Sequence, residues 1–196
     1  MLPGSCTAPW TVGGTAHMTQ PEVLDSADWE RCWAIEAGTV TLQPVTRRIA
    51  HAVLDGGPIT RRFAEGALHD RIPQAMGVAI RDIDSGAAAV LPTVWLVVHR
   101  SDGRIVGDIG THGPPDHEGC VEIGYALAPA ARGQGIGTAA VAAFAGRLAS
   151  VPGIRRLTAV TGADNTASRR LLEGLGFHLM APLPGPGEVR YALVLI

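Results

Sequence analysis

Apolar residues in the chain form short runs that predict strands, separated by turn-forming residues. Residues 94–99 (Val-Trp-Leu-Val-Val-His) are a continuous apolar run, which is typical of a buried strand. Ser101, Asp102 and Gly103 predict a tight turn, after which residues 104–110 return as the next strand. Further strands are predicted over residues 39–45, 121–128, 157–161, 177–183 and 189–196.

A second pattern, with apolar residues three or four positions apart, predicts helices. It appears over residues 45–54, 59–68 and 134–149, and again in a helix capped by Asp164 or Asn165. Residues 70–92 show no clear period, and residues 76–83 are compatible with either a helix or a strand. Strands and helices therefore alternate, which predicts an α/β (α+β) domain with a mixed sheet.

A glycine-rich stretch joins the strand at 121–128 to the helix at 134–149. Gly133, Gly135 and Gly137 alternate with other residues, and Arg132 precedes them. Glycines at a helix N-terminus leave backbone N–H groups open to an anion, and the helix dipole favours negative charge there. The dinucleotide pattern G-x-G-x-x-G fails because Thr138 stands at its third glycine, and no Gly-Lys-Ser/Thr triplet marks a nucleotide P-loop.

What matches instead is Arg132-x-x-Gly135-x-Gly137, which resembles the pyrophosphate-binding signature of the GNAT N-acetyltransferases. Glu122-Ile-Gly-Tyr-Ala-Leu-x-Pro is similar to that family's fourth strand, and residues 165–177 are similar to its next helix and strand entry. The resemblance covers residues 38–196 and is closest to the ribosomal-protein N-terminal acetyltransferases. It implies a mixed, mostly antiparallel sheet of six to seven strands with helices on both faces, following an N-terminal arm over residues 1–37.

The resemblance also implies a function and a cofactor site. Enzymes of this family move acetyl from acetyl-CoA directly to a primary amine in a ternary complex, without a metal. The implied acceptor is a protein N-terminus or a small molecule, and a homodimer is left open. The positions implied to contact CoA are Leu127, Ala128, Arg132, Gly133, Gln134, Gly135, Ile136, Gly137, Thr138 and Asn165.

Two catalytic residues are expected. Glu122 lies within an apolar strand, where a carboxylate that lacks a partner would have a raised pKa suited to a general base, and the competing interpretation is a Glu paired with an Arg. Asp108, His112 and His117 are further candidates for the base. Ser168 matches a serine that stands near the CoA sulfur in the subgroup, although it could simply bond to its own helix backbone.

One departure from the family pattern keeps a second function open. Many members carry a tyrosine where this chain has Leu172, so a catalytically silent acyl-CoA-binding protein is the alternative. Of the two tyrosines, Tyr125 is expected in the core and Tyr191 near the acceptor pocket. His112, Asp116, His117 and Cys120 do not follow a known zinc spacing, so we predict no metal site.

Composition changes this picture little. The chain has 196 residues and a net charge of −2, which gives no reason to expect a nucleic-acid partner. Its three widely spaced cysteines imply no disulfide framework. With no apolar run of about 20 residues and no basic segment followed by an apolar one near residue 1, we expect a cytoplasmic protein without membrane contact.

Overall fold

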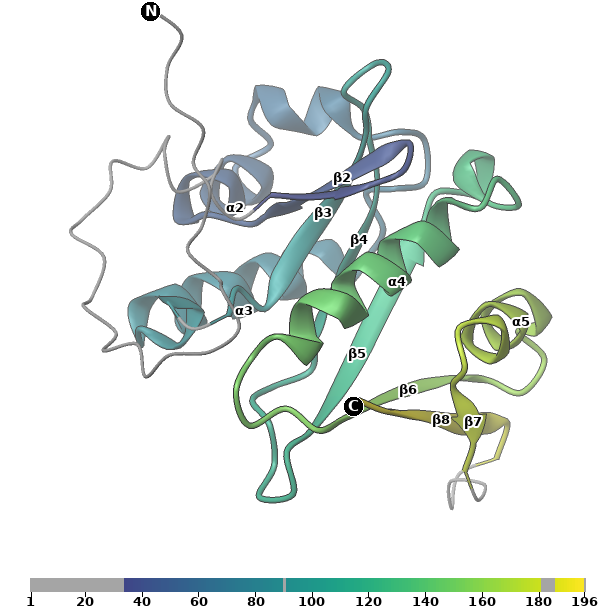
Figure 1. The fold of residues 1–196 in the computed structure, drawn as a ribbon. Coiled ribbons are helices and arrows are strands. Elements are labelled where there is room, and N and C mark those ends of the chain that lie inside the picture. Colours follow the sequence, from purple (N-terminus) through teal and green to yellow (C-terminus); the bar gives the residue numbers. More distant parts are fainter. Residues whose placement is uncertain (1–33, 90, 181–185, 196) are drawn as a thin grey trace, which may run out of the picture.

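The computed structural model describes residues 34–89, 91–180 and 186–195 (Figure 1). Residues 1–33, which are most of the predicted N-terminal arm, lie outside these ranges. The described chain forms a sheet of eight strands in the order β1-β2-β3-β4-β5-β6-β8-β7. These strands are β1 Ile35–Ala37, β2 Val40–Pro44, β3 Val94–His99, β4 Ile105–Thr111, β5 Cys120–Leu127, β6 Arg156–Gly162, β7 His178–Leu179 and β8 Glu188–Val194.

The sheet is mixed and mostly antiparallel, as predicted, because only β5 and β6 run parallel. The sequence predicted up to seven strands. The additional strand is β1, which lies just before residue 38 and pairs with β2. Helices cover both faces. Helix α4 (Ile136–Ala149) contacts β1, β2 and β4, while α3 (Ile72–Asp84) contacts β3 and packs against α2 (Arg47–Leu54). Helix α5 (Thr166–Gly174) lies beside β6 and β8 (Figure 1).

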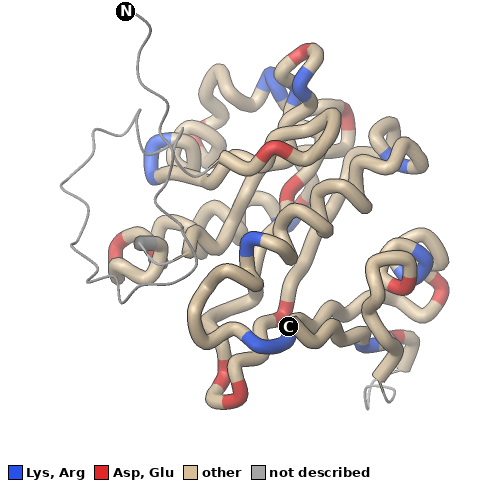
Figure 2. The backbone as a smooth tube through the Cα atoms, in the orientation of Figure 1, with Lys and Arg blue, Asp and Glu red and all other residues tan. Residues whose placement is uncertain are grey.

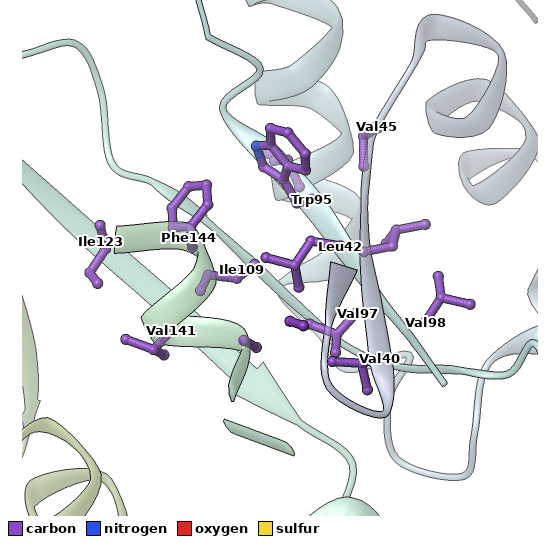
Figure 3. Packing of buried hydrophobic residues seen from close by; sticks show 14 of the residues in the cluster. Val40, Leu42, Val45, Trp95, Val97, Val98, Ile109, Ile123, Val141 and Phe144 are labelled. Atoms are coloured by element: carbon purple, nitrogen blue, oxygen red, sulfur yellow. The ribbon is translucent and has the colours of Figure 1, made fainter. Parts of the chain in front are cut away.

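The core lies between the sheet and α4 (Figure 3). Trp95 of β3 and Phe144 of α4 are fully buried, and their rings meet edge to face with centroids 6.0 Å apart. Val141 and Leu148 continue the predicted apolar stripe of α4. This helix has a single charged residue, Arg147, and is otherwise apolar or small, so it packs closely on the sheet (Figure 2).

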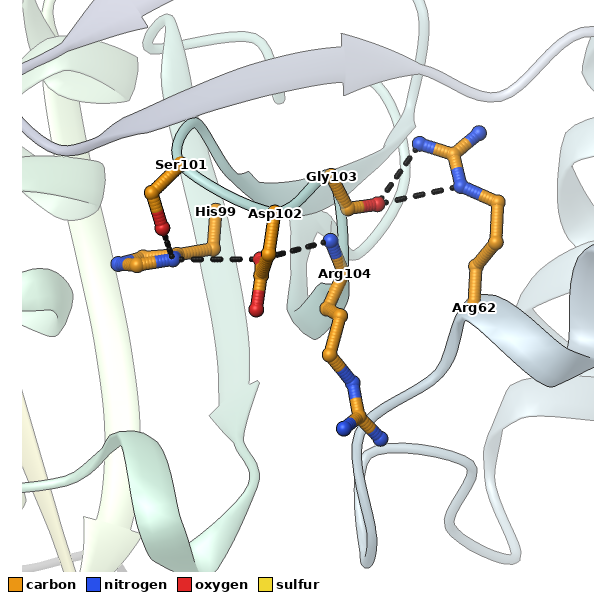
Figure 4. Close-up of polar contacts among 6 residues, drawn as sticks. All are labelled: Arg62, His99, Ser101, Asp102, Gly103 and Arg104. Atoms are coloured by element: carbon orange, nitrogen blue, oxygen red, sulfur yellow. Dashed lines mark hydrogen bonds and ion pairs between the residues drawn. The ribbon is translucent and has the colours of Figure 1, made fainter.

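The predicted turn after β3 is present and is held by side chains (Figure 4). The Asp102 carboxylate accepts the Arg104 backbone N–H, a bond that lowers the pKa of Asp102, and also lies 3.3 Å from the His99 ring. Arg62 donates two hydrogen bonds to the Gly103 carbonyl. The turn thereby ties the β3–β4 hairpin to the segment that follows α2.

The helix predicted over residues 59–68 is wrong. Only a 3₁₀ turn, η1 (Pro58–Arg62), forms there, and Phe63 then takes an extended backbone that bridges to Ile105 of β4. Backbone bonding to the first residue of β4, where the Ala64 N–H donates to the Ile105 carbonyl, has replaced helical propensity at this point. The ambiguous segment beyond it contains α3, which begins at Ile72 with proline in its first turn.

Candidate functional site

The strands β5 and β6 separate halfway along their length. They pair in register from Cys120 with Arg156 to Ile123 with Ala159, and the pairing stops there. Beyond this point β6 continues only with β8, while β5 continues only with β4. Figure 1 shows the two strands diverging toward α5. The last four residues of β5 therefore have an open edge on the β6 side.

Backbone alternation determines which groups of β5 face that opening. The Ala128 N–H donates to Val106 and the His112 N–H donates to the Glu122 carbonyl, so the even-numbered residues of β5 bond to β4. The amides of Tyr125 and Leu127 consequently point toward the side that β6 has left. The Leu127 carbonyl already accepts a bond from Arg132 Nε at 3.0 Å.

The glycine-rich stretch follows at once. After a short 3₁₀ turn, η3 (Pro129–Ala131), Gly133 and Gly135 adopt positive φ values of 72° and 76°. Gly135 is the N-cap of α4, and it has no side chain with which to accept a hydrogen bond from the helix's first N–H groups. A Cβ added at either glycine would enter open space. The predicted bend with exposed donors at a helix N-terminus is thus present.

Among the residues implied to contact CoA, those at 132–138 differ in exposure. Arg132, Gly133, Gln134, Gly135 and Thr138 are exposed, whereas Ile136 and Gly137 are buried and can offer only backbone N–H groups. Gly137 lies against Leu127 and Leu171, since a Cβ there would come within 3.3 Å of the first and 2.8 Å of the second. The Ala128 N–H is already bonded to the Val106 carbonyl, whereas the Leu127 N–H points toward the open edge of β5. Leu127 is therefore better placed than Ala128 to contact the cofactor.

Helix α5 presents polar groups toward β5. Asn165 is its N-cap, and the Asn165 side chain accepts the Ser168 N–H at 3.1 Å. The Ser168 hydroxyl lies 2.8 Å from the Tyr125 hydroxyl, so this hydrogen bond joins α5 to the separated part of β5. Burial raises the pKa of Tyr125, and the phenol therefore stays protonated at neutral pH.

Glu122 lies on the face of β5 opposite to Tyr125. The apolar strand suggested a carboxylate without a partner, but Glu122 has two. One of its oxygens lies 3.0 Å from His112 Nδ1, and the other lies 3.7 Å from an Arg190 nitrogen of β8. The Glu122 side chain is 30% exposed. Pairing with an arginine, the competing interpretation of this residue, is what the structure contains.

A second histidine–carboxylate pair lies on the same face. Asp108 of β4, which is paired in register with Ala126, approaches His69 Nε2 at 2.7 Å. Burial raises the pKa of the Asp108 carboxyl, and its hydrogen bond to His69 opposes this only in part. Polar groups thus flank the open half of β5 on both faces of the sheet.

Comparison with known proteins identifies the family. The acetyltransferase (GNAT) domain matches residues 39–178. The chain belongs to the GNAT acetyltransferase family. An uncharacterized N-acetyltransferase of Bacillus subtilis is 35% identical over 85 residues, which are 43% of this chain and 51% of that protein. The chain therefore matches about half the length of this curated relative.

Solved GNAT structures share the fold. A ribosomal-protein-S5-alanine acetyltransferase from Vibrio fischeri aligns with a TM-score of 0.61 and 15% identity, covering 83% of this chain and 96% of that one. RimL, a ribosomal L7/L12 α-N-protein acetyltransferase in complex with coenzyme A, aligns with a TM-score of 0.63 and 17% identity, covering 83% and 98%.

The two tyrosines of this GNAT protein both contact the core. Tyr125 packs against the core cluster, as expected, but it is half-buried and its hydroxyl reaches Ser168. Tyr191 is fully buried, with its hydroxyl bonded to Arg169 and Glu173 of α5, so the placement near an acceptor pocket is wrong. The sequence placed Tyr125 on the same face as Ile123 and Leu127, but nothing in it indicated that α5 comes within reach.

Within the described ranges, no group of three His, Cys, Asp or Glu side chains is arranged to hold a metal ion. Asp116 instead closes its own loop, accepting the N–H groups of Glu118 and Cys120, and these bonds lower its pKa. None of the described helices has the length and apolar character needed to cross a membrane.

The buried Asp108 gives a testable pH dependence. Its raised pKa means that the folded protein holds this proton more tightly than the unfolded chain. The resulting stabilisation is complete below the unfolded value near 3.8 and is lost as pH rises through the folded pKa. We expect Asp108→Asn to remove this loss, so that the stability of the variant relative to wild type in urea unfolding rises as pH increases above the unfolded value near 3.8.

Asp102→Asn is the matched control. The pKa of the exposed Asp102 carboxylate is lowered, so its contribution to stability is lost only as pH falls below the unfolded value near 3.8, and above that pH the variant should keep a constant difference from wild type. If the difference in unfolding free energy between Asp108→Asn and wild type stayed constant as pH rises, burial would not be disfavouring the Asp108 carboxylate.

Proposed function

We propose that this protein is an N-acetyltransferase that moves acetyl from acetyl-CoA to a primary amine by direct transfer in a ternary complex. One observation carries the proposal: the open edge of β5 at Tyr125–Leu127 leads directly into the uncapped N-terminus of α4. An extended pantetheine arm needs backbone partners, and a diphosphate needs N–H donors and positive charge. Here the two are consecutive along the chain.

The cofactor would be held mainly by backbone. The diphosphate would lie over Gly133, Gln134, Gly135, Ile136, Gly137 and Thr138, with Arg132 supplying charge, while Leu127 and Ala128 flank the pantetheine and Asn165 offers its side-chain amide. Because the diphosphate end lies beyond Leu127, the thioester end would point back toward Ile123, where β5 and β6 meet.

The chemistry would then use groups on both faces of β5. A Tyr125 or Leu127 N–H would stabilise the oxyanion that forms when the amine attacks. Glu122 supplies the negative charge that helps remove a proton from the amine. Ser168, hydrogen-bonded to Tyr125, would stabilise the departing CoA thiolate.

The acceptor is proposed to be a protein N-terminus or a small-molecule amine. The names of RimL and of the Vibrio fischeri protein, which refer to ribosomal-protein acetylation, favour a protein α-amine. We further propose that residues 38–196 are the acetyltransferase domain, preceded by an arm at residues 1–37 whose last three residues join its sheet as β1. We also propose that the protein is cytoplasmic and can form a homodimer.

One observation favours a second function, a silent acyl-CoA-binding protein. Leu172 is fully buried where many family members carry a tyrosine, so that position offers no proton donor. The two functions differ in CoA release, which a thiol reagent measures with acetyl-CoA and a panel of peptide α-amines, polyamines and aminoglycosides. Sustained amine-dependent release supports the enzyme. Acetyl-CoA binding by calorimetry without release from any amine would support the silent function.

A further inference from the structure

We propose that His112, positioned by Glu122, is the general base that deprotonates the acceptor amine, so that Glu122 acts through the imidazole. This inference rests on the proposed function and names the proton acceptor within it. Three observations carry it: the His112–Glu122 contact, the place of the ring over β5, and the pairing of Glu122 with Arg190.

The contact with Glu122 decides which ring nitrogen is available. His112 Nδ1 lies 3.0 Å from the Glu122 carboxylate, so in the neutral ring Nδ1 carries the hydrogen and donates it. Nε2 then keeps its lone pair and can accept a proton. The His112 side chain is 63% exposed, so the imidazole ring lies at the surface of the sheet, where an amine can approach it.

The ring also lies where a base is needed. A Cβ added to Gly124 would come within 2.6 Å of His112 Nε2, so the imidazole covers Gly124 and depends on the absence of a side chain there. Gly124 is the first residue of β5 beyond the end of its pairing with β6. Nε2 is therefore displaced from the Glu122 carboxylate toward the proposed thioester end of the cofactor.

Arg190 completes the arrangement. Its guanidinium lies 3.7 Å from the second Glu122 oxygen, so the carboxylate is held between a cation and the imidazole. These are the charged groups that contact Glu122 and His112 within the described chain. A carboxylate held in this way fixes the ring and stabilises the imidazolium that forms when the proton is taken.

The reaction balances without another reagent. Nε2 takes one proton from the amine nitrogen, whose lone pair forms the C–N bond to the thioester carbonyl carbon. The carbon–sulfur bond then breaks, and its electron pair leaves with the CoA thiolate. The thiolate takes up a proton from the Ser168 hydroxyl, which is hydrogen-bonded to Tyr125, or from solvent. The products are the acetylated amine and CoA.

The test is chemical rescue of His112→Ala, using acetyl-CoA and the amine of the panel with the fastest CoA release. We expect kcat to fall roughly tenfold, because water can partly replace an exposed base. Added imidazole should restore the rate in proportion to its free-base concentration. His178→Ala, a change at an exposed histidine of β7, should leave the rate unchanged and insensitive to imidazole. Glu122→Gln should slow the enzyme without rescue, because the ring remains in place.

The outcomes separate the two proposals. Full activity of His112→Ala, or a slow variant that imidazole does not rescue while its melting temperature and acetyl-CoA affinity stay normal, would overturn the role of His112 and leave the transferase intact. Absence of CoA release from the wild-type protein with every amine would overturn the proposed function, and this inference with it.

Discussion

Gly135→Val is expected to weaken acetyl-CoA binding by at least about 100-fold, or about 2.7 kcal/mol. Gly135 is the N-cap of α4 with φ of 76°, and its Cα faces open space. A valine would place a branched Cβ where the diphosphate has to approach, and its backbone would resist the left-handed conformation that aims the N–H groups outward. Titration calorimetry with acetyl-CoA measures the loss.

Gly86→Val is the matched control for backbone strain. Gly86 has φ of 80°, also faces open space, and follows α3 away from the proposed cofactor site. Both variants should lose similar stability, on the order of 1–2 kcal/mol, whereas only the Gly135 variant should lose the cofactor. Normal affinity in Gly135→Val would show that the diphosphate lies elsewhere.

The glycine bend could be predicted because its requirements are written in residue type. A positive φ and an unobstructed backbone both demand glycine, and the helix that follows is rich in alanine. The strands 94–99 and 121–128 were equally predictable, since their apolar runs are long and bounded by turn residues. Local chemistry determines each of these features.

The pattern of residue types alone does not predict where β5 separates from β6. Gly124, which follows Ile123, weakens a strand, but it does not by itself determine that β5 keeps β4 as its partner while β6 continues with β8. The helix expected over 59–68 failed for a related reason. A bridge between Phe63 and Ile105, far apart in sequence, outweighed the helical spacing.

The partners of the candidate catalytic residues are also long-range. The sequence placed Glu122 inside an apolar strand and so suggested a carboxylate without a partner, but Arg190 reaches it from β8 and His112 from the loop before β5. Tyr125 and Ser168 are 43 positions apart, and only the packing of α5 beside β5 joins their hydroxyls. Residue type gave the candidates, whereas tertiary packing gave their partners.

That last pair leads to the second large effect. We expect Tyr125→Phe and Ser168→Ala each to lower kcat about 100-fold, the low end for loss of a proton-donating group. The Tyr125 phenol, kept protonated by burial, can donate through Ser168 to the thiolate, and the half-buried site admits water poorly as a substitute. Thiol release at saturating acetyl-CoA measures kcat, and calorimetry should show little change in cofactor affinity.

A double-mutant cycle distinguishes this relay from two independent structural roles. If the hydroxyls act as one unit, the double variant should be no slower than either single variant, whereas independent roles would multiply the two losses. Tyr191→Phe is the matched control, because it removes a hydroxyl bonded to Glu173 and Arg169 from a fully buried ring. It should cost about 1 kcal/mol of stability and leave kcat unchanged. Multiplicative losses at Tyr125 and Ser168 would exclude the relay, because a proton path through both hydroxyls is broken once either is removed.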